Sequence, residues 1–400
     1  MSEAVSQRAP SEPPKPTATE FDSIALLLQG GGALGSYQAG VYEALIERDI
    51  EPTWIAGISI GSVNSAIIAG NPPAERVAKL RTFWESITAA GAVWSDWTDM
   101  FSGVAAREFI NQFSAGRALT SGVPGFFQPR FPPPPMRSNG TAAATSWYDM
   151  GELRTTLERL VDFDRINARQ MRFSVGAVNV HTGNFAYFDN AKDTIRSDHI
   201  MASCALPPAF PAVEVDGEFY WDGGMVSNTP LDWVLSAPSD LDTLVFQVDL
   251  WSARGVLPRD LAEVAVRMKE IQYSSRTRAA TDQFRQRQKL RAAFNELLAQ
   301  MPPELVETPQ AKMLAKAADP SLYNIVQLIY RSPTYEGQSK DYEFSRQTMQ
   351  EHWQAGYRDA KITLAHSEVL KLPKTAVEVY DFVTPPAERP MVAKSAKTSI

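Results

Sequence analysis

The sequence predicts an α/β fold with a mainly parallel sheet, and two short segments carry most of that prediction. An apolar run over 24–28 leads into glycines at 30–32 and then into apolar residues at helical spacing. A second apolar run begins at Trp54, leads into a glycine-serine turn over 57–61 and continues as a helical pattern to about Ala69. Strands buried on both faces are continuously apolar, and parallel strands need long, usually helical connections. The chain has 400 residues and 44% hydrophobic content, which is enough for a large core.

The turn over 30–35 follows the first predicted strand and precedes a helix. It contains four glycines: Gly30, Gly31, Gly32 and Gly35. Such a loop can present several backbone N–H groups to an anion, and glycines allow the ligand to come close. This turn is therefore a candidate binding loop.

Three of these glycines also satisfy G-x-G-x-x-G, which is typical of a Rossmann-type dinucleotide-binding oxidoreductase. In that fold an acidic residue ends the second strand, so that its carboxylate reaches the ribose. Here Glu51 precedes the strand that begins at Trp54. The order disfavours the Rossmann alternative, which also leaves the second glycine turn unexplained.

That second turn has the spacing of a nucleophile elbow, G-x-S-x-G, with Ser59 between Gly57 and Gly61. A serine on a sharp strand-to-helix turn projects its hydroxyl only if the residues two before and two after it lack colliding side chains. The turn also directs the amide of Ile60 and the positive end of the following helix toward a developing oxyanion. Ser59 is the candidate nucleophile.

An aromatic and proline-rich segment over about 94–148 interrupts the α/β pattern. It includes Phe126, Phe127 and Phe131 and four consecutive prolines over 132–135, and proline at this density excludes regular structure. We interpret it as a lid, an acyl-binding rim or a membrane-touching loop, with a purely structural insertion as the alternative.

Two strand pairs are predicted next, over 173–188 and over 213–221. The second pair leads into Asp222-Gly223-Gly224. An acid that leaves a strand into two glycines has a fixed backbone and little steric cover. These are properties that a catalytic carboxylate requires.

A further buried strand is predicted over 244–250, and helices dominate after it. The first begins near Asp260 and carries an apolar stripe, and a second amphipathic helix spans 345–366. The stripe consists of Leu261, Val264, Met268 and Ile271. Between residues 259 and 291 there are nine Lys or Arg against four Asp or Glu. That surplus fits either anionic lipid headgroups or a solvated helix face.

The composition limits which binding partners and which cellular location we expect for the protein. The net charge of −7 is opposite to the basic character of nucleic-acid binding proteins, so we expect no nucleic-acid partner. The single cysteine, Cys204, forms no internal disulfide, and no Cys/His spacing suggests zinc, so we expect neither metal nor cofactor. The segments 1–20 and 386–400 are predicted disordered tails without a signal peptide. We therefore expect a cytoplasmic protein that contacts membranes only at their surface.

A serine nucleophile needs a base, and the usual one is histidine. The chain has four histidines, at 181, 199, 352 and 366, and none follows the pattern of an α/β-hydrolase. Asp222 is the better candidate, because burial would raise its pKa toward working pH.

Taken together, GGGALG between a strand and a helix, GISIG within GISIGSVNSAIIAGN, and DGG within WDGGMVSNTPL occur in the order found in one family. The chain resembles the bacterial patatin-like phospholipases over roughly residues 24–250. The resemblance implies a three-layer α/β/α fold for a hydrolase domain over 21–250. The helical C-terminal region predicted over 251–385 is not explained by the family core. The resemblance implies Ser59 as nucleophile and Asp222 as base without histidine. It also places the oxyanion hole at Gly31 and Gly32.

The function that the resemblance implies is a serine acyl hydrolase, of the lipase or phospholipase type, that acts on lipid or lipid-like esters. Many members of the family carry Arg or Lys where this chain has Leu34. A cation there could assist with a phosphate-bearing substrate, so its absence favours neutral acylglycerols or short esters. The alternative from another class is a catalytically silent, lipid-binding scaffold of the same fold.

Overall fold

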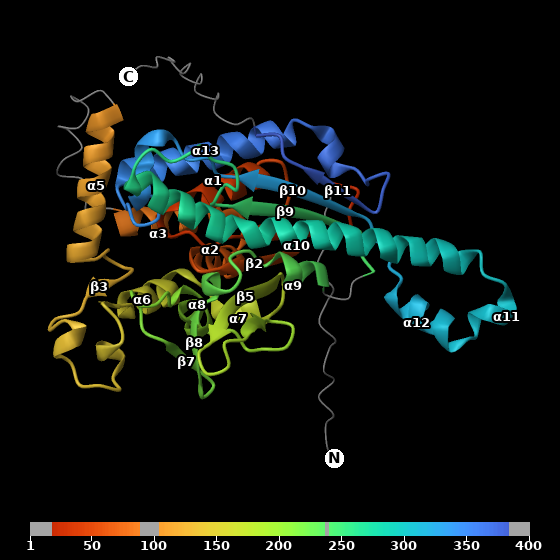
Figure 1. The fold of residues 1–400 in the computed structure, drawn as a ribbon, viewed down its shortest axis with the longest axis horizontal. Helices are drawn as coiled ribbons and strands as arrows, with labels where there is room; N and C mark the ends of the chain where they lie inside the picture. Colours follow the sequence, from red (N-terminus) through yellow and green to blue (C-terminus); the bar gives the residue numbers. More distant parts are fainter. Residues whose placement is uncertain (1–17, 89–103, 237–239, 384–400) are drawn as a thin grey trace, which may run out of the picture.

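A computed structural model describes residues 18–88, 104–236 and 240–383 (Figure 1). Its centre is a nine-stranded sheet in which six neighbouring strands run parallel, so the predicted α/β class with a mainly parallel sheet is confirmed. In spatial order the path is β11 (Val377–Tyr380), β10 (Tyr323–Ile329), β9 (Thr243–Asp249), β1 (Ser23–Leu28), β2 (Trp54–Ile58), β5 (Arg172–Asn179), β8 (Glu218–Asp222) and β7 (Val213–Val215). The antiparallel strand β6 (Phe185–Asp189) also pairs with β5 and confirms the predicted strand pair.

Helices cover both faces of the sheet, which gives the predicted three layers (Figure 1). One face packs against α1 (Ser36–Ile46), α2 (Ile60–Ala69), α3 (Pro73–Thr88), α6 (Gly151–Leu160), α8 (Ser197–Cys204) and α13 (Arg346–Leu364). The other face packs against α9 (Leu231–Ser236) and α10 (Leu261–Ala299). Alternate residues of β1 belong to the two cores, with Leu26 in one and Leu27 in the other. This is why its sequence is apolar without a break.

The region after residue 250 is helical in large part, but it also extends the sheet. Strand β10 pairs with β9, and β11 pairs with β10, both in parallel register. Helix α13 packs closely on α1, because Gly40 and Gly356 leave room for the facing backbone. A Cβ at Gly40 would overlap the carbonyl of Trp353. The amphipathic stripe predicted over 345–366 is thus a core surface, with Met349 and Trp353 buried.

At the distal end of α10, the chain turns through α11 (Pro303–Val306) and α12 (Pro309–Ala317) before it re-enters the sheet at β10 (Figure 1). No helix in the described ranges is long and apolar enough to cross a bilayer. The predicted tails fall outside the described residues except at 18–20. There, Thr19 and Glu20 are hydrogen-bonded to the carbonyl of Leu370.

The segment over 94–148 differs in part from its prediction. Residues 94–103 lie outside the described ranges, and α5 (Val104–Ser121) is a regular helix, because the dense prolines begin only after it. Phe126 and Phe127 are buried in an aromatic cluster with Phe210, so they are not available as a lipid-touching rim. Phe131 is 91% exposed, so contact with lipid stays a prediction for this one side chain.

Candidate active site

The site lies where three parallel strands end side by side. Leu28, the last residue of β1, is in register with Gly57 of β2 on one side and with Val248 of β9 on the other. Because the carboxyl ends of parallel strands meet at one edge, the glycine loop after β1, the elbow after β2 and the residues after β9 are neighbours.

Ser59 has the backbone of a nucleophile elbow, with φ of 54° and ψ of −127° between β2 and α2. The two flanking glycines are required by contact: a Cβ at Gly57 would overlap the carbonyl of Gly61, and one at Gly61 would overlap that of Leu28. The Ser59 amide donates to Ser203 Oγ at 3.0 Å, which fastens the turn to α8. The serine itself is half-buried, so a substrate can reach it.

Asp222 ends β8, and its side chain lies close enough to the Ser59 hydroxyl for that group to lower its pKa. The carboxylate also accepts the Gly224 amide at 2.7 Å, while the Asp222 amide donates to the carbonyl of Ala205 at 3.0 Å. Burial raises the pKa of Asp222 to about 7, although the Ser59 hydroxyl and the hydrogen bond from Gly224 act against that shift. A carboxylate with this pKa can accept a proton near neutrality.

The glycine loop places two amides where an anion could bind. The Gly30 amide donates to the carbonyl of Asn228 at 3.2 Å, and the Ala33 amide donates to the carbonyl of Asp341 at 2.9 Å. Gly31 and Gly32 lie between Gly30 and Ala33 in the chain. Among the described residues neither of their amides has a protein acceptor, and both glycines are partly exposed. Gly32 has φ of 56°, and a Cβ there would overlap the Asp341 carbonyl. This geometry suits an oxyanion hole.

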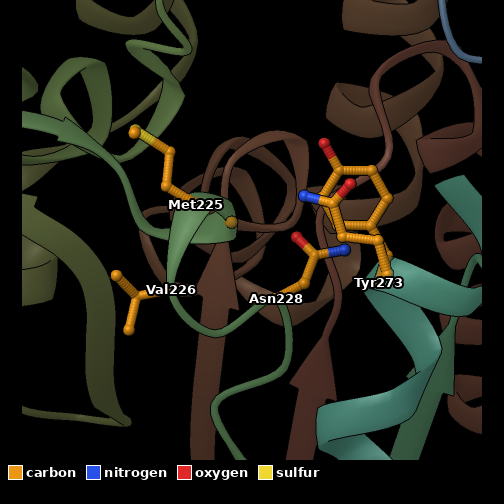
Figure 2. A pocket seen from close by; sticks show the side chains of 6 residues that line it. Met225, Val226, Asn228 and Tyr273 are labelled. Atoms are coloured by element: carbon orange, nitrogen blue, oxygen red, sulfur yellow. The ribbon is translucent and has the colours of Figure 1, made fainter.

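The carbonyl of Gly30 is held by two side chains. It accepts Asn228 Nδ2 at 2.8 Å and Trp251 Nε1 at 2.9 Å. In a trans peptide the following N–H points away from the carbonyl, so these bonds also set the direction of the Gly31 amide. Figure 2 shows Asn228 between the turn that carries Met225 and the helix that carries Tyr273. We call Asn228 and Trp251 the Gly30 clamp.

Buried amide side chains then connect the glycine loop to the elbow helix. Gln38 Nε2 donates to the carbonyl of Gln29 at 2.7 Å, and Asn64 Nδ2 donates to Gln38 Oε1 at 2.9 Å and to the carbonyl of Gly35 at 2.9 Å. Asn64 lies on α2, directly after Ser59 and Gly61. The hydrogen bonds of Gln38 and Asn64 therefore hold the glycine loop and the elbow in one fixed arrangement.

Sequence reasoning did not identify Asn228, Trp251 or Ser203. Trp251 follows the end of β9 at the same sheet edge as the two glycine turns, and that position is a signal available from the strand pattern. Asn228 lies shortly after the Asp-Gly-Gly turn. Ser203 had no signal, because its contact with the elbow depends on how α8 packs.

None of the four histidines contacts the Ser59–Asp222 pair. His181 faces Glu218 at 3.3 Å, His199 bonds the backbone at Arg196, and His366 stacks on Phe382. His352 is fully buried, with Nε2 3.1 Å from Glu336 and Nδ1 3.4 Å from the carbonyl of Ala33. Burial lowers the pKa of His352, but the Glu336 carboxylate outweighs it and raises that pKa above its usual value. His352 therefore supports the glycine loop through its contact with the carbonyl of Ala33.

Leu34, the position where the family resemblance leads us to expect a cation, is fully buried in the core. An arginine at this position would be desolvated among apolar side chains, so Leu34→Arg would destabilise the fold and is not a clean test of substrate preference. Within the described ranges, no three His, Cys, Asp or Glu side chains gather as a metal site would require.

The Gly30 clamp gives a prediction that separates positioning from folding. We expect Trp251→Phe to lower kcat about tenfold with KM nearly unchanged, because it removes one of the two hydrogen bonds that orient the Gly31 amide and leaves an aromatic side chain in place. The matched control is Trp54→Phe in β2. It removes the hydrogen bond of 2.9 Å that the Trp54 indole donates to Ser174 Oγ of β5. Kinetics and thermal unfolding of both variants check this. Equal losses of kcat in the two variants would assign Trp251 to stability alone.

The chain was compared with known protein families and curated proteins. A family described as "Patatin-like phospholipase" matches residues 26–235, and one described as "Patatin phospholipase" matches residues 271–376. Lysophospholipase NTE1 of Candida glabrata is 23% identical over 232 residues, which are 58% of this chain and 10% of that protein. Triacylglycerol lipase SDP1L of Arabidopsis thaliana is 42% identical over 52 residues, 13% of this chain and 6% of that protein. The matched segments therefore span a tenth or less of these curated relatives.

Two solved structures are similar at a lower level. VipD from Legionella pneumophila aligns with 90% of this chain and 71% of its own at 14% identity and a TM-score of 0.32. The ExoU–SpcU complex of Pseudomonas aeruginosa aligns with 77% of this chain and 67% of its own, at 16% identity and a TM-score of 0.24.

Proposed function

Since the chain belongs to the patatin-like phospholipase family, we propose that it is a serine acyl hydrolase that cleaves carboxylic esters of lipids through Ser59 and Asp222. The placement of the Ser59 hydroxyl beside the buried Asp222 carboxyl, at the turn after β2, is the observation that carries this proposal. It joins a nucleophile on a strained turn to a buried base beside two unpaired amides, and these are the parts that acyl transfer needs.

The proposed reaction has two halves. Asp222 accepts the Ser59 proton as Oγ attacks the ester carbonyl, and the amides of Gly31 and Gly32 stabilise the oxyanion. The carboxylic acid then returns the proton to the leaving alcohol as the ester C–O bond breaks, which leaves an acyl-serine. In the second half Asp222 takes a proton from water, the resulting hydroxide attacks the acyl carbon, and the proton returns to Ser59 as the fatty acid leaves.

The proposed substrates are lipid or lipid-like esters. Two relatives are named as a lysophospholipase and a triacylglycerol lipase, which differ in whether the substrate bears a phosphate. Because Leu34 is fully buried in the core, it does not decide between the two classes, and the preference for neutral acylglycerols and short esters over phospholipids stays a prediction from the sequence. Hydrolysis rates for a phospholipid, a diacylglycerol and a p-nitrophenyl ester would rank these classes.

The pH profile tests the proposed base. Only the carboxylate form of Asp222 accepts a proton, and the pKa of about 7 means that this form is lost as the pH falls below neutrality. We therefore expect kcat/KM for a soluble ester, and the rate of serine labelling by a fluorophosphonate, to rise together through about pH 7 to a plateau.

The matched control is Asp249→Asn. Asp249 is also buried, and burial raises its pKa to about 7, but its partners are Gln247 and Thr229 rather than Ser59. This variant should keep the rise near pH 7. A flat profile in the wild type, or a rise that disappears in Asp249→Asn, would remove Asp222 as the base. Absence of labelling would instead favour a silent scaffold.

A further inference from the structure

The first turns of α10 carry their apolar side chains on the outside of the molecule. Leu261 is 87% exposed and Met268 is 66% exposed, and Val264 and Ile271 are exposed with them. Together with Leu257, which precedes the helix and is also exposed, these residues form what we call the α10 stripe. The spacing of the stripe is helical, so its four helix members lie on one face over about 15 Å.

Several inward-facing side chains in the first half of the same helix are polar, which reverses the usual arrangement there. Ser274 and Thr277 are buried, and Ser274 Oγ donates to the carbonyl of Glu270 at 2.5 Å. Arg267 is directed inward, where it donates to the carbonyl of Ala253 at 2.6 Å. A surface helix normally turns its apolar face toward the core. An apolar outer face of this length indicates an apolar partner outside the chain.

The helix that carries the stripe also reaches the candidate active site. Ile271 is followed by Gln272 and Tyr273, which line a small pocket with Gly224 and Met225 beside Asp222 (Figure 2). Met225, on the turn that holds the carboxylate, is a second exposed apolar side chain at this pocket. A protein seated on this surface would cover the pocket, whereas a lipid layer would present ester groups to it.

We infer that the α10 stripe is the face that docks on a lipid surface, an inference that rests on the proposed function of the site. Three cations near the stripe are paired within the chain. Arg267 pairs with Glu270 at 3.0 Å, Lys269 pairs with Asp341 at 2.8 Å, and Arg259 pairs with Glu263. Docking is therefore driven by burial of apolar surface, and we expect little dependence on anionic lipid or on salt.

Vesicle binding tests the inference without requiring catalysis. The full chain carrying Ser59→Ala is mixed with phosphatidylcholine vesicles and sedimented, alone and with Leu261→Ser and Met268→Ser added. We expect the stripe substitutions to reduce bound protein at least fivefold. The matched control adds Leu290→Ser and Leu297→Ser on the distal half of α10, where the side chains are 59% and 53% exposed. This control should bind like the parent.

The same substitutions in the active protein separate docking from chemistry. Hydrolysis of a vesicle-borne ester should fall in the stripe variant, while hydrolysis of a soluble p-nitrophenyl ester stays within about twofold of wild type. Equal vesicle binding by stripe and control variants would overturn the inference, as would binding that requires phosphatidylserine and is lost at high salt. A wild type that binds vesicles but hydrolyses no ester would overturn the proposed function and leave the docking face in place.

Discussion

Ser59→Ala is expected to lower ester hydrolysis at least a thousandfold and to abolish fluorophosphonate labelling. The substitution removes the nucleophile and deletes only one oxygen, so it leaves the packing around the elbow nearly unchanged. Asp222→Asn is expected to be almost as damaging, because an amide keeps the shape of the carboxylate but cannot accept the serine proton. Steady-state kinetics on a soluble ester measure both effects.

Circular dichroism and thermal unfolding provide the control for folding. Asp249→Asn changes a carboxylate of similar burial at the end of β9 and should retain most of the activity. Turnover by Ser59→Ala above about a thousandth of the wild-type rate would exclude this serine as the nucleophile. If His181→Ala or His199→Ala in a folded protein lost activity while Asp222→Asn kept it, a histidine base would replace the proposed carboxylate.

The second large effect is expected at the glycine loop, where Gly32→Ala should lower kcat about a hundredfold. Gly32 has φ of 56°, and the new Cβ would overlap the carbonyl of Asp341, so the loop must move. Movement displaces the amides of Gly31 and Gly32, and the loss of one oxyanion donor costs about 3 kcal/mol in the transition state. KM should change less, because the donors act on charge that develops only during the reaction.

Gly116→Ala is the matched control for the loop. Gly116 lies within α5, and a Cβ added there meets no atom within 4 Å, so kinetics should be unchanged. The ratio of kcat values for the two variants is the measurement that decides. A Gly32→Ala protein that folds and keeps the wild-type kcat would show that the oxyanion is stabilised elsewhere, for example at the Ile60 amide.

The sequence by itself determined the features that depend on residues close together in the chain. Continuous apolar runs mark β1 and β2, because strands buried on both faces need apolar residues at every position. The elbow at Ser59 follows from the spacing of Gly57 and Gly61, since a side chain at either glycine collides with nearby backbone. The helix start predicted near Asp260 is confirmed, because the Asp260 side chain accepts the Glu263 amide in the first turn of α10.

What only the tertiary structure decided depends on residues far apart in the chain. The closeness of Ser59 to Asp222, the burial that raises the pKa of Asp222, and the hydrogen bond from Trp251 to Gly30 all require several strands to end at one edge. The same applies to β10 and β11, whose place in the sheet is set by pairing with β9. A helical stripe in the sequence shows that one face of α10 is apolar, but not which way that face points. The direction is set by the polar contacts of the opposite face, and these turn Leu261 and Met268 toward the solvent.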